Sequence, residues 1–196
     1  MTVIDYDLEF LEDGRTIELI SIGMVCDDGR EYYAVSGALT ARSWRGWRLR
    51  RRIRKHTWLM ENVVPHLPKP LGDWNLHMPK SWLFNYRDPA VKPREQIADE
   101  VMDFIRAAGP DVQLWANYGA YDHVCLAQLW GPMIALPEGV PMFTHDIQQE
   151  RSRLGLAWDD LPQQEGGEHN ALADARHNQR VRRWLADRAR DLEGQP

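Results

Sequence analysis

Cysteine is scarce in this sequence, and long apolar runs are missing from it. Cys26 and Cys125 are the only two cysteines among 196 residues, and both have apolar neighbours. We therefore expect two buried free thiols, and neither a disulfide framework nor a cysteine-based zinc site. No apolar run reaches the roughly 18 residues that a membrane span needs, and no basic segment followed by an apolar stretch opens the chain. These absences predict a cytoplasmic protein that does not enter a membrane.

Positive charge is also scarce, except in one stretch. The formal net charge is −5, from 24 basic and 29 acidic residues. Residues 42–55, "RSWRGWRLRRRIRK", hold eight basic residues and no acid, which leaves 16 basic and 29 acidic residues elsewhere. Such asymmetry predicts a local anion-binding surface on an acidic body.

The order of the predicted elements indicates an α/β fold. Three strands joined by short loops come first, at 3–10, 16–26 and 31–36, and the Asp28-Gly29 turn is a strong hairpin signal, so they should form an antiparallel meander. Helices and strands then alternate: a helix at 94–108, a strand at 112–117, a helix at 121–131, a short strand at 141–147, a helix at 148–154 and a last helix at about 171–192. This order predicts the mixed sheet of a ribonuclease H-like fold, with parallel later strands and helices on both faces.

One segment interrupts the alternation. Residues 38–92 are rich in Arg, Trp and Pro, and we interpret them as a long insertion or arm after the third strand. We expect one domain over residues 1–192, followed by a short tail at 193–196.

The first strand, "VIDYDLEF", carries an unusual row of acids. Residues two apart on a strand share a face, so Asp5, Asp7 and Glu9 point one way and the apolar residues point the other. Asp122 begins a helix after a strand, and Asp174 lies in the first turns of the last helix, preceded by His169. Ligands of open α/β sheets gather where strands end and loops begin, so these groups are expected to meet at one edge of the sheet.

Clustered carboxylates repel one another unless cations neutralise them. Oxygen ligands suit hard ions such as Mg²⁺ or Mn²⁺, and two such ions can stabilise the attacking and leaving oxygens of a phosphodiester. A nearby histidine can then take the proton of the attacking water. Each short motif alone is weak, because about one Asp-x-Glu arises by chance in a chain of this composition, and a solvated acidic face is the alternative interpretation.

The ordered set Asp7-x-Glu9, Asp122 and His169-x4-Asp174 resembles the DEDDh 3′–5′ exonucleases of the RNase T-like group. The longer strings "DLEFLEDGRTIELISIGMV", "ANYGAYDHVCL" and "HNALADAR" resemble its small bacterial exoribonuclease branch, the polyadenylate-specific 3′-exoribonuclease AS type. The resemblance covers about residues 3–36 and 94–190. Larger family members have an Asn four residues before the second-motif Asp, where this chain has Tyr118.

The resemblance implies a metal-dependent exoribonuclease that releases nucleoside 5′-monophosphates from the 3′ end of RNA. It implies that Asp7, Glu9, Asp122 and Asp174 hold two Mg²⁺ or Mn²⁺ ions, and that His169 is the general base. It also implies a homodimer. Asp5 matches no family position. Two alternatives stay open: a DNA-directed 3′–5′ exonuclease of the same chemistry, and a nucleic-acid-binding module that has lost catalysis.

Two further groups are expected to contact the substrate. Phe10, Leu11 and Ile17 follow or face the first motif, where family members receive the terminal base. Arg50, Arg51 and Arg52 are expected to bind phosphates, with Trp44 and Trp47 available for stacking on bases. The alternative for the whole basic stretch is a solvated, mobile arm.

Overall fold

The structure is a computed structural model that describes residues 1–40, 43–69 and 84–193. Residues 41–42 and 70–83 of the predicted insertion, and residues 194–196 of the predicted tail, lie outside these ranges. No helix of the described ranges is both long and apolar enough to cross a membrane.

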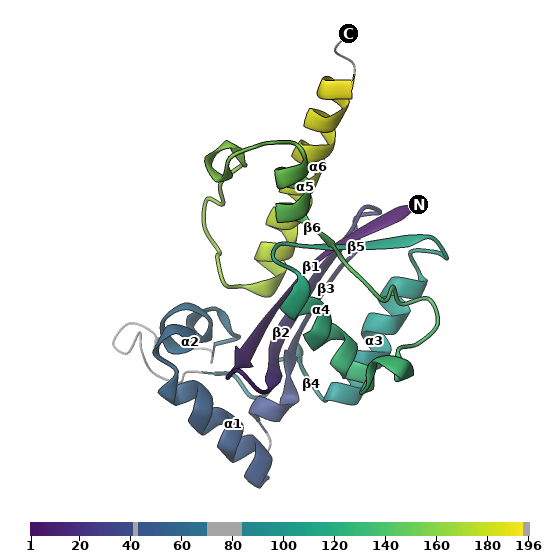
Figure 1. Cartoon of the computed structure of the whole chain (residues 1–196). Coiled ribbons are helices and arrows are strands. Elements are labelled where there is room, and N and C mark those ends of the chain that lie inside the picture. The colour runs from purple at the N-terminus through teal and green to yellow at the C-terminus, as the bar shows by residue number, and fades with distance from the viewer. Residues whose placement is uncertain (41–42, 70–83, 194–196) are drawn as a thin grey trace.

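A six-stranded mixed sheet lies at the centre of the molecule (Figure 1). Its strands, in spatial order, are β4 (Val91–Lys92), β3 (Glu31–Ser36), β2 (Ile17–Cys26), β1 (Thr2–Glu12), β5 (Val112–Ala116) and β6 (His145–Asp146). The first three strands in the chain form an antiparallel meander, β5 runs parallel to β1, and β6 runs parallel to β5. The predicted mixed sheet is confirmed. Strand β4 was not predicted, because two residues are too few to show an alternating pattern.

Helices cover both faces of this sheet, as predicted. The α-helices are α1 (Trp44–Lys55), α2 (Thr57–Asn62), α3 (Arg94–Arg106), α4 (Ala120–Ala127), α5 (Ile147–Arg153) and α6 (Ala171–Glu193). Short 3-10 helices are η1 (Gly37–Leu39), η2 (Val64–His66), η4 (Gln128–Trp130), η5 (Met133–Ala135) and η6 (Trp158–Asp160). In Figure 1, α3 and α4 lie together on the right, and α6 rises past the sheet toward the C-terminus at the top.

The alternation along β1 decides which residues enter the core. Ile4, Tyr6 and Leu8 pack in one buried cluster with residues of α3 and α4. The intervening side chains face α6, where the guanidinium of Arg182 binds Asp5. One strand therefore serves two layers: its apolar face forms the main core, and its acidic face meets the last helix.

A β-bulge in β2 lies next to this acidic face. The pairing passes from Glu9 opposite Ser21 to Phe10 opposite Leu19, so Ile20 is an extra residue in β2. Bulges of this kind re-aim side chains and occur often beside active sites. Here Ile20 joins a second buried cluster, separate from the main core that contains Leu19 and Ile22.

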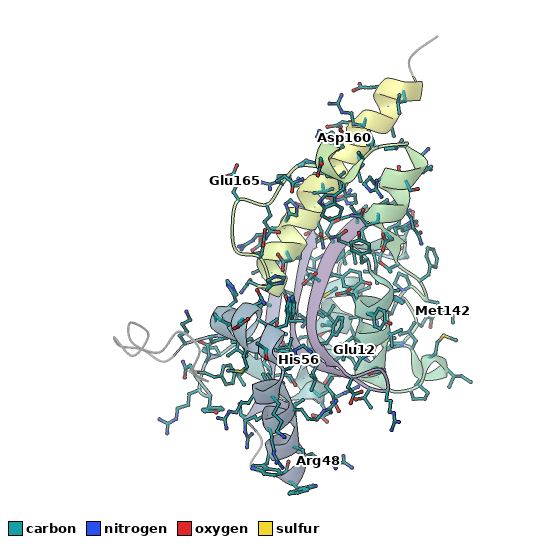
Figure 2. The ribbon with its side chains drawn as sticks, turned by 60° about the vertical axis from the view of Figure 1, so that its left-hand side comes forward. Glu12, Arg48, His56, Met142, Asp160 and Glu165 are labelled. Atoms are coloured by element: carbon teal, nitrogen blue, oxygen red, sulfur yellow. The ribbon has the colours of Figure 1, made fainter. Side chains whose placement is uncertain are left out.

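The described part of the insertion belongs to that second cluster and is not a solvated arm. Leu49 and Ile53, four residues apart on α1, are buried with Leu59 of α2 against Ile20 and Val35 of the sheet. His56 ends α1 and caps the start of α2 through its Nδ1, and Figure 2 labels it at this junction. The alternative of a solvated, mobile arm therefore does not describe α1, whose dense arginines flank an apolar i, i+4 stripe.

Candidate metal and catalytic site

Five residues predicted for the site come from four separate elements. Asp7 and Glu9 lie on β1, Asp122 lies in the first turn of α4, and Asp174 lies in the first turn of α6. His169 lies in the loop before α6, one residue ahead of Asn170, whose Oδ1 accepts a hydrogen bond from the Ala173 N–H at 3.1 Å. Ligand atoms of Glu9, His169 and Asp174 all lie within 4.8 Å of one another. The Oδ1 of Asp122 accepts the N–H of Leu8, the residue between Asp7 and Glu9, at 2.8 Å.

Burial raises the pKa of all four carboxylates of this group, and repulsion within the group adds to the rise for Asp7 and Glu9. Burial and the charges of Asp174 and Asp122 raise the pKa of Glu9 to about 8. Burial raises the pKa of Asp122 to about 7, against the opposing Leu8 hydrogen bond. Burial, then Asp122, Glu9 and Asp174, raise the pKa of Asp7. Burial also raises the pKa of Asp174, although Gln164 and His169 act in the opposite direction.

No lysine or arginine forms an ion pair with any of these four carboxylates in residues 1–40, 43–69 and 84–193. Asp5 differs, although it lies on the same face of the same strand. It is fully buried, and its two carboxylate oxygens accept hydrogen bonds from the guanidinium of Arg182 at 2.8 and 2.9 Å. The structure thus gives Asp5 an internal partner, in agreement with its exclusion from the predicted site.

Three residues that hold the site together were not predicted. Gly23 pairs with Asp7 across the sheet, and a Cβ built on it would lie 2.3 Å from the backbone of Ala171. Only glycine therefore lets the first turn of α6 come this close to β2. Asn178 of α6 donates to the carbonyl of Tyr6 at 3.1 Å, and Gln164 donates to Oδ1 of Asp174 at 2.7 Å. A lone glycine inside a strand pattern was the one available signal.

The insertion reaches this site. Trp58 of α2 makes an edge-on ring contact with His169, with centroids 4.8 Å apart and planes 77° apart. The Nδ2 of Asn170 also donates to the carbonyl of His66 at 3.4 Å. In Figure 2 the insertion, labelled at His56, and the loop before α6, labelled at Glu165, lie on the same side of the molecule.

The residues expected to receive the terminal base occupy different environments. Phe10 is half-buried and stacks on Tyr121, the neighbour of Asp122, with ring centroids 6.4 Å apart. Ile17 is partly buried against the main core. Leu11 packs in the second cluster and is 3% exposed, so its side chain is not at the surface.

The three predicted phosphate ligands also differ from one another. Arg50 donates to the carbonyl of Leu39 at 3.0 Å, and Arg52 binds Asp13 at 2.7 Å. The guanidinium of Arg51 lies over the ring of Trp47, 5.3 Å from its centroid. Trp47 in turn stacks on Trp44, and both rings are exposed.

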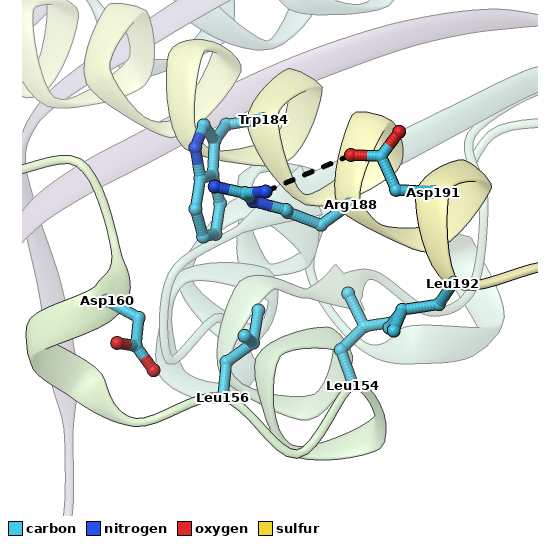
Figure 3. Close-up of a pocket in the computed structure, with 7 residues that line it drawn as sticks. All are labelled: Leu154, Leu156, Asp160, Trp184, Arg188, Asp191 and Leu192. Carbon is cyan, nitrogen blue, oxygen red and sulfur yellow. Dashed lines mark ion pairs between the residues drawn. The ribbon is translucent and has the colours of Figure 1, made fainter. Parts of the chain in front are cut away.

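A cavity of about 620 Å³ lies near the C-terminal end of α6, away from the carboxylates (Figure 3). It is lined by Leu154, Leu156, Asp160, Trp184, Arg188, Asp191 and Leu192. Arg188 lies over the Trp184 ring and pairs with Asp191 at 3.9 Å. This cavity shares no residue with the carboxylate group at the other end of the helix.

A mixed sheet with clustered carboxylates and a histidine at its edge defines a candidate hydrolase of the nuclease class. Comparison with known families agrees: the family described as "3′-5′ exoribonuclease Rv2179c-like domain" matches residues 2–185. The chain belongs to this family of 3′–5′ exoribonucleases.

Individual relatives point to the same class. The chain is 41% identical over 177 residues to the 3′-5′ exoribonuclease Rv2179c of Mycobacterium tuberculosis strain H37Rv, covering 87% of this chain and 85% of that protein. The 3′-5′ exoribonuclease MT2234.1 of strain CDC 1551 matches equally. Among solved structures, S. pombe Pop2p in its Mg²⁺- and Mn²⁺-bound form aligns over 98% of this chain and 85% of its own, with a TM-score of 0.41 and 12% identity.

Proposed function

We propose that this chain is a DEDDh-type 3′–5′ exoribonuclease that needs divalent metal ions and releases nucleoside 5′-monophosphates. The observation that carries the proposal is the group of four clustered carboxylates, Asp7, Glu9, Asp122 and Asp174, with raised pKa values and no Lys or Arg ion pair among the described residues. The relatives described as 3′-5′ exoribonucleases support the direction of attack and the choice of RNA.

The donor set fits hard divalent cations. Four carboxylates supply oxygen ligands, which Mg²⁺ and Mn²⁺ prefer, and the ligand atoms of Glu9 and Asp174 are close enough to share an ion. The family resemblance implies two ions. When bound, such ions would lower the pKa of the attacking water and neutralise negative charge on the phosphate. Because oxygen donors are already sufficient, we assign His169 to proton transfer and not to metal ligation.

The remaining chemistry belongs to the chain's own residues. His169 takes the proton of the attacking water, since one of its ring nitrogens lies within 4.8 Å of the Glu9 and Asp174 oxygens. Gln164 holds Asp174, and the Leu8 N–H holds Asp122, so both carboxylates are oriented before substrate arrives. Phe10, stacked on Tyr121 beside Asp122, offers an aromatic surface for the 3′-terminal base.

The outer face of α1 is proposed to bind the RNA backbone upstream of the cleaved bond. Its exposed Trp44–Trp47 stack with Arg51 over it combines a cation with base-stacking surfaces, as single-strand binding sites do. Arg50 and Arg52 already contact Leu39 and Asp13, so we assign the main phosphate contact of the predicted triplet to Arg51.

The direct test is a 5′-labelled single-stranded RNA incubated with the protein and Mn²⁺. A ladder that shortens from the 3′ end is expected, whereas one internal cut would indicate an endonuclease. The His169→Ala variant should lower kcat by roughly 10²–10⁴-fold, the usual scale for losing a positioned general base. No nucleotide release by the wild-type chain with Mg²⁺ or Mn²⁺ would favour a binding module without catalysis.

Substrates that differ in a single property test the preference for RNA and the preference for adenylate separately. A DNA oligonucleotide of the same sequence should be degraded more slowly, and equal rates would assign the enzyme to both nucleic acids. Oligoadenylate compared with mixed-sequence RNA tests the adenylate preference that the resemblance implies. Light scattering tests the implied homodimer.

A further inference from the structure

We propose that Trp58 is a positioning residue that holds the imidazole of His169 in its working orientation, which makes the insertion part of the active site. This inference rests on the proposed function, since it assigns a partner to the proposed base. Its starting point is the edge-on contact between the two rings, 4.8 Å apart at an interplanar angle of 77°.

The backbone of His169 needs an external support. Its φ of 63° lies in the left-handed region, which residues other than glycine rarely adopt. Gly166 and Gly167, at φ of 143° and 78°, lie just before it in a segment without regular secondary structure. A conformation of this kind persists where the surroundings impose it. The imidazole lies beside Glu9 and Asp174, and the Trp58 ring supplies an aromatic contact from a different element.

Trp58 is itself held in place by the fold of the insertion. The Nδ1 of His56 caps α2 by accepting the Leu59 N–H at 3.3 Å, and Leu59, next to Trp58, is buried in the second core cluster. The Trp58 carbonyl accepts a hydrogen bond from Asn62 at 2.9 Å. The hydrogen bond from Asn170 to the His66 carbonyl joins the same two segments a second time.

Core packing does not explain this tryptophan. It is 48% exposed and is not among the residues packed in the buried cluster beneath α2. An aromatic contact onto the proposed base gives the position a role that hydrophobic burial does not. The competing role is stacking on an RNA base, and that role predicts a different kinetic signature.

The experiment compares Trp58→Ala, Trp58→Phe and Trp158→Ala on a single-stranded RNA with saturating Mn²⁺. Trp158 is a matched control, because it is 46% exposed and stacks on Tyr118. Trp58→Ala should lower kcat roughly 3- to 10-fold, as expected for one aromatic contact, with KM within about twofold. Its pH–rate profile should shift on the limb that reports protonation of the base. Trp58→Phe should restore most of kcat, and Trp158→Ala should leave kcat unchanged.

A spectrum of the histidine rings gives a readout that is independent of catalysis. The ring C–H signal of His169, assigned by its absence in His169→Ala, should move in Trp58→Ala and stay unmoved in Trp158→Ala. Thermal melting shows whether each variant is folded, and Trp58→Leu, which keeps an apolar side chain but removes the aromatic ring, serves if Trp58→Ala is not.

The outcomes separate this inference from the proposed function. If wild type releases nucleotides and His169→Ala does not, but Trp58→Ala keeps the wild-type kcat and His169 signal, the positioning role is wrong and the exonuclease stands. A raised KM with unchanged kcat would also overturn it, because Trp58 would then bind substrate. If wild type releases no nucleotide, the proposed function fails, and an unmoved His169 signal in Trp58→Ala would show that the positioning contact fails as well.

Discussion

Two acidic positions on the same face of β1 differ in what lies across from them. Asp5 meets the middle of α6, where Arg182 binds both of its carboxylate oxygens and also binds Asp27 at 2.8 Å. Glu9 meets the beginning of α6, where Asp174 and His169 lie and no Arg or Lys of the described residues forms an ion pair with it. One strand therefore carries an internally neutralised carboxylate and, four residues away, a carboxylate group that must take protons or cations from solution.

The pKa values express the same difference. Burial raises the pKa of Asp5 to about 6, and the hydrogen bonds and charge of Arg182 act against that rise. Burial raises the pKa of Glu9 to about 8, and the neighbouring carboxylates add to the rise. A buried carboxylate with its own arginine is a structural feature. The carboxylates around Glu9 have no such arginine among the described residues, so only a proton or a cation from solution can neutralise them. We therefore place the chemistry there.

The largest effect is expected at the unpaired group. Asp122→Asn should lower kcat by roughly 10³-fold or more, because it removes a charge proposed to bind metal and organise the phosphate. The fold should persist, since the asparagine Oδ1 can still accept the Leu8 N–H. Kinetics with Mg²⁺ and thermal melting check both parts. Near-wild-type rates in a folded variant would show that Asp122 is not in the site.

The paired position should behave in the opposite way. Asp5→Asn should lower the free energy of unfolding by about 1–3 kcal/mol, because Arg182, only 11% exposed, loses a charge-assisted hydrogen bond to its buried partner and keeps only the ion pair with Asp27. The folded fraction should keep its kcat. Denaturant titration and kinetics below the midpoint measure these quantities. If Asp5→Asn is as inactive as Asp122→Asn while remaining stable, the distinction between the two acidic positions is lost.

The pH dependence of the metal-free protein should also reflect the unpaired group. The folded-state pKa of Glu9, about 8, lies above its ordinary value of 4.5, so between these values the folded state binds more protons than the unfolded state. Stability in EDTA should therefore fall as pH rises, by on the order of 2 kcal/mol between pH 6.5 and 8, a window above the titration of Asp5. Saturating Mg²⁺ or Mn²⁺ should remove the fall, and Glu9→Gln should reduce it, leaving the part that comes from Asp122, whose pKa is about 7. A metal-free curve that is level across this window would contradict the shift.

The smallest effect is expected on α1, where Arg52 forms an ion pair with Asp13 and Arg51 forms none among the described residues. Arg51→Ala should flatten the slope of log K for RNA against log salt by about 0.7, the contribution of one single-strand phosphate contact. Arg52→Ala is the matched control: it should leave the slope unchanged, because Arg52 is bound to Asp13. Binding titrations at several salt concentrations decide this. Equal slopes in wild type and Arg51→Ala would leave α1 without a role in binding RNA.

The sequence predicted the sheet well because strands such as "VIDYDLEF" alternate strictly between apolar and acidic residues, and this alternation shows which side chains share a face. It also predicted which acids come together, because Asp122 and Asp174 each follow a strand or loop at the beginning of a helix. The partner of Asp5 was not visible: Arg182 is 177 residues away, and nothing in the spacing connects them. The same holds for Trp58 and His169, which meet only after the insertion folds.

The packing of the insertion was not predicted. Basic residues dominate the composition of α1, so the two apolar residues Leu49 and Ile53 did not stand out as a buried stripe. Gly23 was a smaller omission. A glycine in a strand is a weak signal by itself, and its role depends on how closely Ala171 approaches.

The most direct test of the account is a calorimetric Mn²⁺ titration of the wild type, Asp7→Asn and Asp5→Asn, each shown to be folded at the temperature used. Wild type should bind Mn²⁺, Asp7→Asn should lose most of this binding, and Asp5→Asn should keep it, because only Asp7 belongs to the carboxylates without an internal cation. Binding that survives Asp7→Asn, or that disappears in Asp5→Asn, would contradict this expectation.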